Sequence, residues 1–175
     1  MSNIALLIAG GTGVRMHQDI PKQFLSVNDK PVIVYTMEAF QNHPEIDAIY
    51  IACLHGWQNM LQAYIKQFGL TKVKKIVKGG ENGQASIRNG VFAIAKDYEY
   101  DDLILVHDAI RPMVSADIIS DNIVKCKQHG NAVTVIPCME AMLKSEDEYQ
   151  SEESILRNCL FRAQTPQTIC VKEAV

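Results

Sequence analysis

Short apolar runs alternate along the chain with segments in which apolar residues recur every three or four positions. The run at 4–9 is almost continuously apolar, which is typical of a strand buried on both faces. Helical spacing is found in segments that end near Gly69 and Gly130, two glycines placed to stop helices. The pattern predicts strands at 4–9, 48–53, 73–77, 103–106 and 132–136, and helices at 31–40, 57–68, 85–95 and 115–129.

This order predicts an α/β fold of Rossmann-like type, a three-layer sandwich in which helices cover both faces of a mostly parallel sheet. The chain has 175 residues, the size of one domain, so we expect residues 1–175 to form a single domain. In such sheets ligands bind beyond the carboxyl ends of the strands. The loops after Ala9 and Val106 leave strands in this way and are the expected ligand loops.

The last third of the chain departs from the alternation. Residues 139–154 carry six acidic side chains against one lysine, which favours a solvated, protruding hairpin or loop within residues 138–160. We call residues 138–160 the arm. The chain ends in what resembles the start of a helix at 171–175, so we expect it to be truncated at its C-terminus.

Composition narrows the class of protein. Hydrophobic residues make up 47% and charged residues 21%, which is too apolar for a disordered chain. The net charge of −3 argues against a general nucleic-acid binder, and no apolar stretch approaches the roughly 20 residues of a membrane span. The five cysteines form no C-x-x-C pair, and no leader pattern precedes the first strand, so we expect a cytoplasmic protein with reduced thiols.

A glycine-rich loop follows the first predicted strand. Backbone N–H groups of Gly10, Gly11 and Gly13 can approach phosphate oxygens closely because no Cβ intervenes. The dinucleotide fingerprint and the P-loop are both absent, but Arg15 and Lys22 stand close enough in sequence to face the same phosphates. The alternative is a tight turn with two solvated basic side chains.

Four motifs in this order resemble the cytidylyltransferases that act on polyol phosphates, a family that includes the methylerythritol-phosphate and ribitol-phosphate enzymes. The resemblance covers nearly the whole chain and rests on the order of the motifs. They are residues 9–16 with 21–25, residues 79–80 with 86–90, residues 106–112, and Arg157 with residues 165–167.

The resemblance implies that CTP and a polyol phosphate react to give a CDP-polyol and pyrophosphate. Arg15 and Lys22 would then hold the triphosphate and stabilise the transition state. The acceptor phosphate is already anionic, so the chemistry needs no general base, and we expect His107 to be a packed structural histidine. The CTP-binding residues implied by the resemblance are Ala9, Gly10, Gly11, Thr12, Gly13, Gly80, Glu81 and Ser86.

On the acceptor side, the resemblance places Asp108, Arg111, Arg157 and Thr165 at the polyol phosphate. A carboxylate at a strand end beside a triphosphate suggests that Asp108 binds Mg²⁺ or contacts the polyol hydroxyls. Arg111 would orient Asp108 or reach phosphate. In the family an arm from one subunit reaches the site of the other, which implies a homodimer.

The resemblance favours ribitol 5-phosphate as the acceptor, and three alternative functions compete with this one. One is a 2-C-methyl-D-erythritol 4-phosphate cytidylyltransferase of isoprenoid synthesis, although residues 10–13 look more like the ribitol-phosphate branch. The second is a truncated homologue that binds CTP without turnover. The third, a nicotinamide-dependent oxidoreductase, is disfavoured because no acidic residue directly follows the strand predicted at 48–53.

Overall fold

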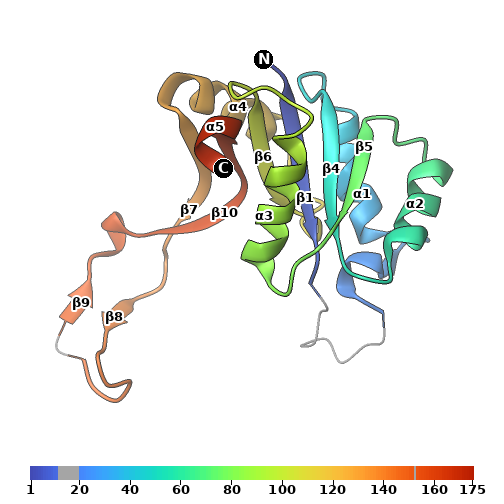
Figure 1. The fold of residues 1–175 in the computed structure, drawn as a ribbon. Helices are drawn as coiled ribbons and strands as arrows, with labels where there is room; N and C mark the ends of the chain where they lie inside the picture. Colours follow the sequence, from blue (N-terminus) through green and yellow to red (C-terminus); the bar gives the residue numbers. More distant parts are fainter. Residues whose placement is uncertain (12–19, 152) are drawn as a thin grey trace.

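The computed structural model describes residues 1–11, 20–151 and 153–175 (Figure 1). Five helices and ten strands are present in these ranges, with two short 3₁₀ turns. The helices are α1 (Val32–Gln41), α2 (Gln58–Gln67), α3 (Gly83–Ile94), α4 (Ala116–His129) and α5 (Val171–Ala174); the turns are η2 (Lys22–Phe24) and η3 (Arg157–Cys159). The strands are β1 (Asn3–Ala9), β2 (Ser26–Val27), β3 (Lys30–Pro31), β4 (Ala48–Cys53), β5 (Val73–Lys78), β6 (Leu103–Asp108), β7 (Asn131–Pro137), β8 (Met142–Lys144), β9 (Glu153–Ile155) and β10 (Phe161–Cys170).

Six strands form the main sheet in the order β5-β4-β1-β6-β10-β7. Strands β4, β1 and β6 pair in parallel, as does β5 with β4, whereas β10 is antiparallel to both of its neighbours. The carboxyl ends of β1, β4 and β6 therefore meet at one edge of the sheet, the lower edge in Figure 1. This edge is where the sequence predicts the ligand loops.

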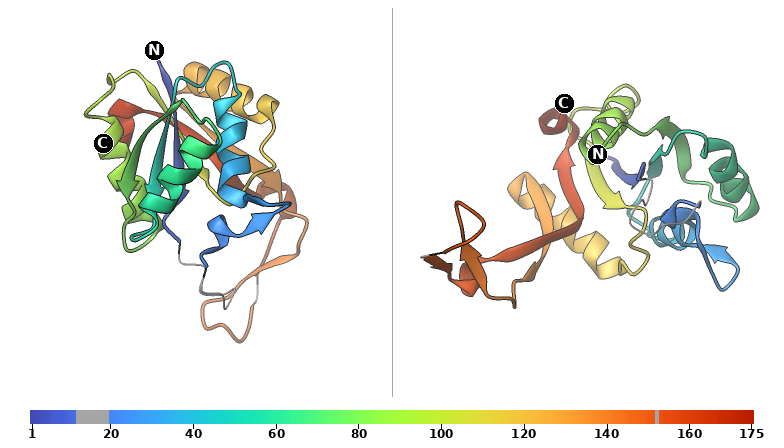
Figure 2. Two further views of the ribbon diagram at one scale, coloured as in Figure 1. Left: turned by 90° about the vertical axis from the view of Figure 1, so that its right-hand side faces the viewer. Right: turned by 90° about the horizontal axis from the view of Figure 1, so that it is seen from below.

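Helices cover both faces of this sheet, which confirms the predicted three-layer fold. The side chains of β1 alternate between two cores: Ala5 and Leu7 belong to the larger one, and Ile4 and Leu6 to the smaller. The larger core includes buried residues of α1, α2 and α4, and the smaller includes buried residues of α3 and α5. Figure 2 shows α1 and α4 on one side of the sheet and α3 on the other.

Most element boundaries agree with the sequence prediction within two residues, and the reasons are local. Ser115 caps α4, its hydroxyl accepting a hydrogen bond from the amide of Ile118, and Gly130 follows the helix with a positive φ of 89°. Gly69 likewise follows α2 with a positive φ. Among the described residues, no helix has both the length and the apolar character that crossing a membrane requires.

The main error of the sequence prediction is β10. This ten-residue strand lies inside the sheet between β6 and β7, yet the sequence pattern shows no strand there. Its pairing with β7 is irregular between Ala163 and Gln167, around Pro166, and residues 161–163 at its start are exposed. A proline and a half-polar pattern argue against an internal strand, and here tertiary pairing overrides both.

The arm protrudes from the body as a hairpin, as the acidic sequence predicts (Figure 1). Its two strands, β8 and β9, pair over only three residues each. At the base of the arm, Arg162 forms an ion pair with Glu140 at 3.2 Å, and the amide of Cys138 donates to the carbonyl of Leu160. The arm therefore continues the β7–β10 pair beyond the helix-covered sheet.

Candidate active site

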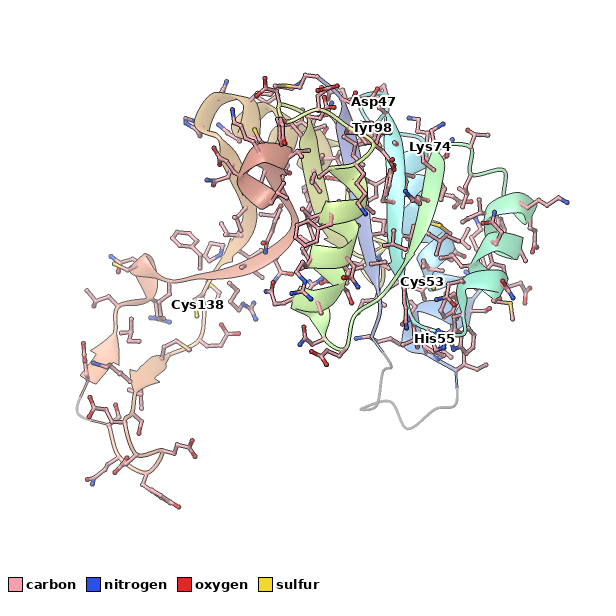
Figure 3. The ribbon with its side chains drawn as sticks, in the orientation of Figure 1. Asp47, Cys53, His55, Lys74, Tyr98 and Cys138 are labelled. Atoms are coloured by element: carbon pink, nitrogen blue, oxygen red, sulfur yellow. The ribbon has the colours of Figure 1, made fainter. Side chains whose placement is uncertain are left out.

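A cavity of about 440 Å³ opens at the carboxyl edge of the sheet, a volume within the usual range for small-molecule sites. Figure 3 helps to locate this edge, because Cys53 and His55 mark the carboxyl end of β4 while Asp47 precedes its other end. The cavity draws its walls from four segments that are far apart in sequence. Its described lining residues are Ile8, Ala9, Gly10, Gly11, Lys22, Gln23, Glu81, Asn82, Gly83, Ser86, Asp108, Ile110 and Arg111.

One wall is built from glycines packed around a buried serine. Ser86 is 1% exposed, and its hydroxyl accepts from the amide of Gly80 and donates to the carbonyl of Asn82, both at 2.9 Å. A Cβ on Gly10 would lie 2.7 Å from the Ser86 hydroxyl, and one on Gly80 would lie 2.6 Å from the carbonyl carbon of Ala85. The absence of side chains is therefore what allows these backbones to approach the serine.

The amino end of α3 forms part of the same wall. Asn82 caps the helix, since its side chain accepts from the amide of Ala85 at 2.9 Å, and Gly83 opens the first turn. The unpaired N–H groups of a first helical turn and the helix dipole both favour an anion. Lys22, from η2, adds a cation to the cavity lining.

A buried glutamine fixes the floor between these segments. Gln23 is 1% exposed and donates through its amide nitrogen to the carbonyls of Ala9, at 2.9 Å, and Gly11, at 3.0 Å. The next residue, Phe24, stacks on Trp57 with ring centroids 4.6 Å apart. These contacts tie η2, and with it Lys22, to the end of β1.

A second wall of the cavity carries a carboxylate paired with an arginine. The Arg111 Nε lies 2.7 Å from the Asp108 Oδ2, and a second guanidinium nitrogen of Arg111 donates to the side-chain oxygen of Gln164. The Thr165 hydroxyl accepts from the backbone amide of Asp108 at 3.3 Å. Both members of the ion pair are about 40–45% exposed, so the pair faces solvent in the cavity.

Comparison with known proteins decides the family. The chain matches the IspD family, 2-C-methyl-D-erythritol 4-phosphate cytidylyltransferase, over residues 3–174. A protein named ribitol-5-phosphate cytidylyltransferase from Lacticaseibacillus paracasei is 45% identical over 163 residues, which cover 93% of this chain and 70% of that protein. The chain belongs to the IspD family of cytidylyltransferases.

Other members agree with this assignment in sequence and in structure. A 2-C-methyl-D-erythritol 4-phosphate cytidylyltransferase from Clostridium botulinum is 39% identical over 166 residues, covering 94% of this chain and 71% of that one. The crystal structure of a 4-diphosphocytidyl-2C-methyl-D-erythritol synthase from Anaerococcus prevotii superposes with a TM-score of 0.83 at 20% identity, covering 98% of this chain and 71% of that one. That likeness shows a shared fold.

Within this IspD-family fold, the structure brings most of the predicted site residues to one cavity. The predicted CTP-binding residues that line it are Ala9, Gly10, Gly11, Glu81 and Ser86, and Lys22, Asp108 and Arg111 line it too. Gly80 and Thr165 lie directly behind the lining, each hydrogen-bonded to a lining residue. Thr12, Gly13 and Arg15 lie outside the described residues.

Arg157 is the exception, because it lies in η3 within the arm and does not line this cavity. Its guanidinium donates to the carbonyl of Met139 at 3.3 Å, across the arm. The structure does not bring Arg157 together with Asp108 and Thr165 in the same chain's site.

The described residues contain no cluster of three or more His, Cys, Asp or Glu side chains able to hold a metal. The cavity nevertheless offers two carboxylates, Asp108 and Glu81. Mg²⁺ usually takes one or two protein carboxylates and completes its shell with water and substrate phosphates. The oxygen donors present therefore fit Mg²⁺ bound together with a phosphate ligand.

Sequence reasoning gave no site role to Gln23 and Gln164, nor to the lining residues Ile8, Asn82, Gly83 and Ile110. Gln23 lies inside the 21–25 motif beside Lys22, and this position was the one sequence feature that could have indicated a site role. Gln164 directly precedes the 165–167 motif. No sequence pattern predicts the hydrogen bonds of these two glutamines, because their partners lie in other elements.

Proposed function

We propose that this chain transfers the cytidylyl group of CTP to a polyol phosphate, with ribitol 5-phosphate as the favoured acceptor, releasing pyrophosphate. The observation that carries this is the single cavity shared by the Gly10–Ser86–α3 wall and the Asp108–Arg111 wall. The first wall suits a nucleoside triphosphate and the second suits a phosphorylated polyol. The 45% identical relative named for ribitol 5-phosphate favours that acceptor.

The residues fit the electronic demands of this transfer. An acceptor phosphate oxygen forms a bond to the α-phosphorus, the bond to the β-phosphate bridging oxygen breaks, and pyrophosphate leaves with the electron pair. No proton has to move, so the protein's task is positioning and charge neutralisation. Lys22 and the amino end of α3 supply positive potential at the cavity, and Arg15 would add a second catalytic cation.

On the acceptor side, Asp108 would accept hydrogen bonds from polyol hydroxyls, and Arg111 would bind the anionic phosphate while orienting Asp108. Thr165 would support the same group from behind Asp108. When bound, Mg²⁺ would neutralise charge on the triphosphate, and Asp108 is the residue proposed to hold it.

The test is acceptor-dependent pyrophosphate release with CTP and Mg²⁺. Ribitol 5-phosphate, 2-C-methyl-D-erythritol 4-phosphate and no acceptor are compared for the wild-type chain, for Lys22→Ala, and for Lys66→Ala. Lys66 lies exposed on α2, away from the cavity, and so controls for loss of one positive charge. Release that requires ribitol 5-phosphate and is lost only in Lys22→Ala supports the proposal.

Two other outcomes point elsewhere. Release that requires the methylerythritol acceptor supports the second candidate, which the 39% identical relative and the family's name favour. Measurable CTP binding without release for either acceptor would instead make the chain a CTP-binding homologue without turnover.

We propose further that the active form is a homodimer in which the arm serves the partner's site. The arm exposes large apolar side chains, including Met139 (74% exposed), Leu143 (66%) and Leu156 (69%), and a two-stranded hairpin this short has little stability of its own in water. Its Arg157 lies away from its own cavity.

Mixing inactive variants tests this arrangement. Lys22→Ala spoils the cavity and leaves the arm intact, whereas Arg157→Ala does the reverse. In a mixed dimer, the intact cavity of the second variant would receive the intact arm of the first, so mixing should restore up to half of the sites in each mixed dimer. Activity that never exceeds the sum of the two separate variants would contradict the shared site.

The cytoplasm is the compartment we propose. All five cysteines are free thiols, which is typical of a reducing compartment. The partners that we propose for the protein are small molecules, and the net charge of −3 gives no support for nucleic-acid binding.

A further inference from the structure

His107 directly precedes Asp108, yet it takes no part in lining the cavity. The side chain is 1% exposed and lies on β6, and its ring packs against the ring of Phe40 of α1 with centroids 5.1 Å apart. A histidine in this place cannot exchange protons with a ligand in the cavity. Its burial and its position beside two site residues therefore call for another explanation.

The hydrogen bonds of His107 are one-sided. Its Nε2 lies 3.0 Å from the carbonyl oxygen of Arg111, whereas its Nδ1 is buried and has no hydrogen-bond partner among the described residues. A carbonyl only accepts, so the proton of the neutral ring must be on Nε2. Burial lowers the pKa of His107 and outweighs the opposing effects of the Arg111 carbonyl and the Asp108 charge, which favours the neutral form of the ring.

The carbonyl that His107 holds belongs to the turn that presents the site. The amide of Arg111 donates to the carbonyl of Asp108 at 3.0 Å, closing the turn, and the amide of Ala109 donates to the carbonyl of Ile8 at 3.1 Å. From α1, the buried hydroxyl of Thr36 donates to the carbonyl of Ala109 at 2.8 Å. The backbone of this turn is thus fixed at Ala109 and at Arg111 by donors from two different elements.

The same residue whose carbonyl accepts from His107 holds the Asp108 carboxylate through its guanidinium. A shift of the Arg111 backbone would therefore move the Nε that lies 2.7 Å from Asp108 and the contact with Gln164. The side chains of Asp108 and Arg111 are about 40–45% exposed, so these polar contacts, rather than packing, hold them in place.

We infer that His107 is a positioning residue whose Nε2, through the Arg111 carbonyl, fixes the Asp108–Arg111 pair for the polyol phosphate. This inference rests on the proposed function for the identity of the ligand. Its structural half, the ordering of the 108–111 turn by His107, stands independently of any ligand.

Three substitutions separate this role from simple packing. His107→Phe keeps a ring beside Phe40 and removes the donor. His107→Gln places an amide nitrogen at about the reach of Nε2. His107→Asn places one at about the reach of Nδ1, for which the described part of the chain offers no partner. The inference requires Gln to behave like histidine and both Phe and Asn to behave as loss of the donor.

Steady-state kinetics on the full chain give the first readout. For Phe and Asn we expect the KM for ribitol 5-phosphate to rise about ten-fold, the effect of losing one hydrogen bond that orders a binding group, with the KM for CTP within about two-fold of wild type. His107→Gln should restore the acceptor KM to within about three-fold. Equal effects on both substrates, or no difference between Gln and Asn, would overturn the inference.

Hydrogen exchange gives the second readout and needs no turnover. In Phe and Asn variants, the amide of Arg111 should exchange about ten-fold faster than in wild type, while amides in α2 remain unchanged; Gln should restore protection. If the wild-type chain transfers nothing to any acceptor, the proposed function fails, and this exchange pattern alone still decides the role of His107. Unchanged Arg111 exchange in all three variants would refute it.

Discussion

The packing of Gly10 against Ser86 predicts that the effect of Gly10→Ala on the free energy of unfolding changes sign when Ser86 is replaced by alanine. Gly10→Ala would place a methyl group 2.7 Å from the Ser86 hydroxyl, closer than the two atoms can approach. The next atoms, the Ser86 Cβ at 3.6 Å and the Gly79 Cα at 3.7 Å, are at ordinary contact distance. The whole clash therefore lies with one oxygen atom.

That oxygen cannot move without loss, because it makes two hydrogen bonds of 2.9 Å, to Gly80 and to Asn82. At a net 0.5–1.5 kcal/mol for each bond, rotating Ser86 away costs about 1–3 kcal/mol of unfolding free energy. Ser86→Ala alone removes the same two bonds and should cost a similar amount. If the two substitutions acted independently, the double variant would lose about 2–6 kcal/mol.

The structure predicts a different result. Once Ser86→Ala has removed the oxygen, the methyl group on Gly10 meets only ordinary contacts among residues 1–11, 20–151 and 153–175, and Gly10 does not have a positive φ. Replacing glycine by alanine then stabilises by about 0.4–1 kcal/mol through the unfolded chain. Gly10→Ala should thus destabilise the wild type and leave the Ser86→Ala variant unchanged or slightly more stable.

Urea denaturation of the four proteins measures the free energies, and titration with CTP reports whether the same coupling reaches the ligand. The expected loss of CTP affinity for either single variant is roughly 5- to 150-fold, the binding equivalent of about 1–3 kcal/mol. Equal destabilisation by Gly10→Ala in both backgrounds would refute the packing described for this wall.

Three further predictions follow from other residues. Lys22→Ala should lower kcat by on the order of 10²-fold with little change in unfolding free energy, measured by pyrophosphate release and urea denaturation. An undiminished kcat would show that Lys22 does not stabilise the transition state. Burial raises the pKa of Cys53 and of Cys126 to about 11, so at pH 8 a disulfide reagent should label exposed Cys159 first, and equal labelling rates would contradict this. Burial lowers the pKa of His107, so this side chain binds a proton more readily in the unfolded chain than in the folded one. The contribution of the buried His107 to stability is therefore present above pH 6.5 and is lost as pH falls below that value. The slope of unfolding free energy between pH 7 and pH 5 should therefore be shallower in His107→Gln, and an unchanged slope would assign the pH dependence to other groups.

The sequence was most informative where periodicity and local chemistry agree. The apolar run at 4–9 predicts a strand buried on both faces, and in the structure its side chains are divided between two cores. Gly10, Gly11, Lys22 and the Asp108 turn line one cavity because parallel strands bring their carboxyl ends together.

The remaining features depend on contacts between distant segments. Strand β10 is held by backbone pairing on both sides, so its polar residues and Pro166 give no strand pattern. The ion pair of Arg111 with Asp108 was one of two alternatives that the sequence left open. The clamp formed by Gln23 depends on two backbone carbonyls, and no periodicity reports where a carbonyl will lie.

The place of β10 in the sheet has a consequence for how the chain acquires its structure during synthesis. Strand β7 leaves the ribosome before β10, yet β10 lies between β7 and the parallel strands. The nascent chain can pair β1 with β4 and β6 early, but β7 has no strand partner until residues 161–170 emerge. At roughly 5–20 residues per second, this interval of about 30 residues lasts roughly 2–6 seconds. During this interval, the open edge of β6 and the unpaired β7 are the surfaces that a chaperone bound to the nascent chain would need to shield from other nascent chains.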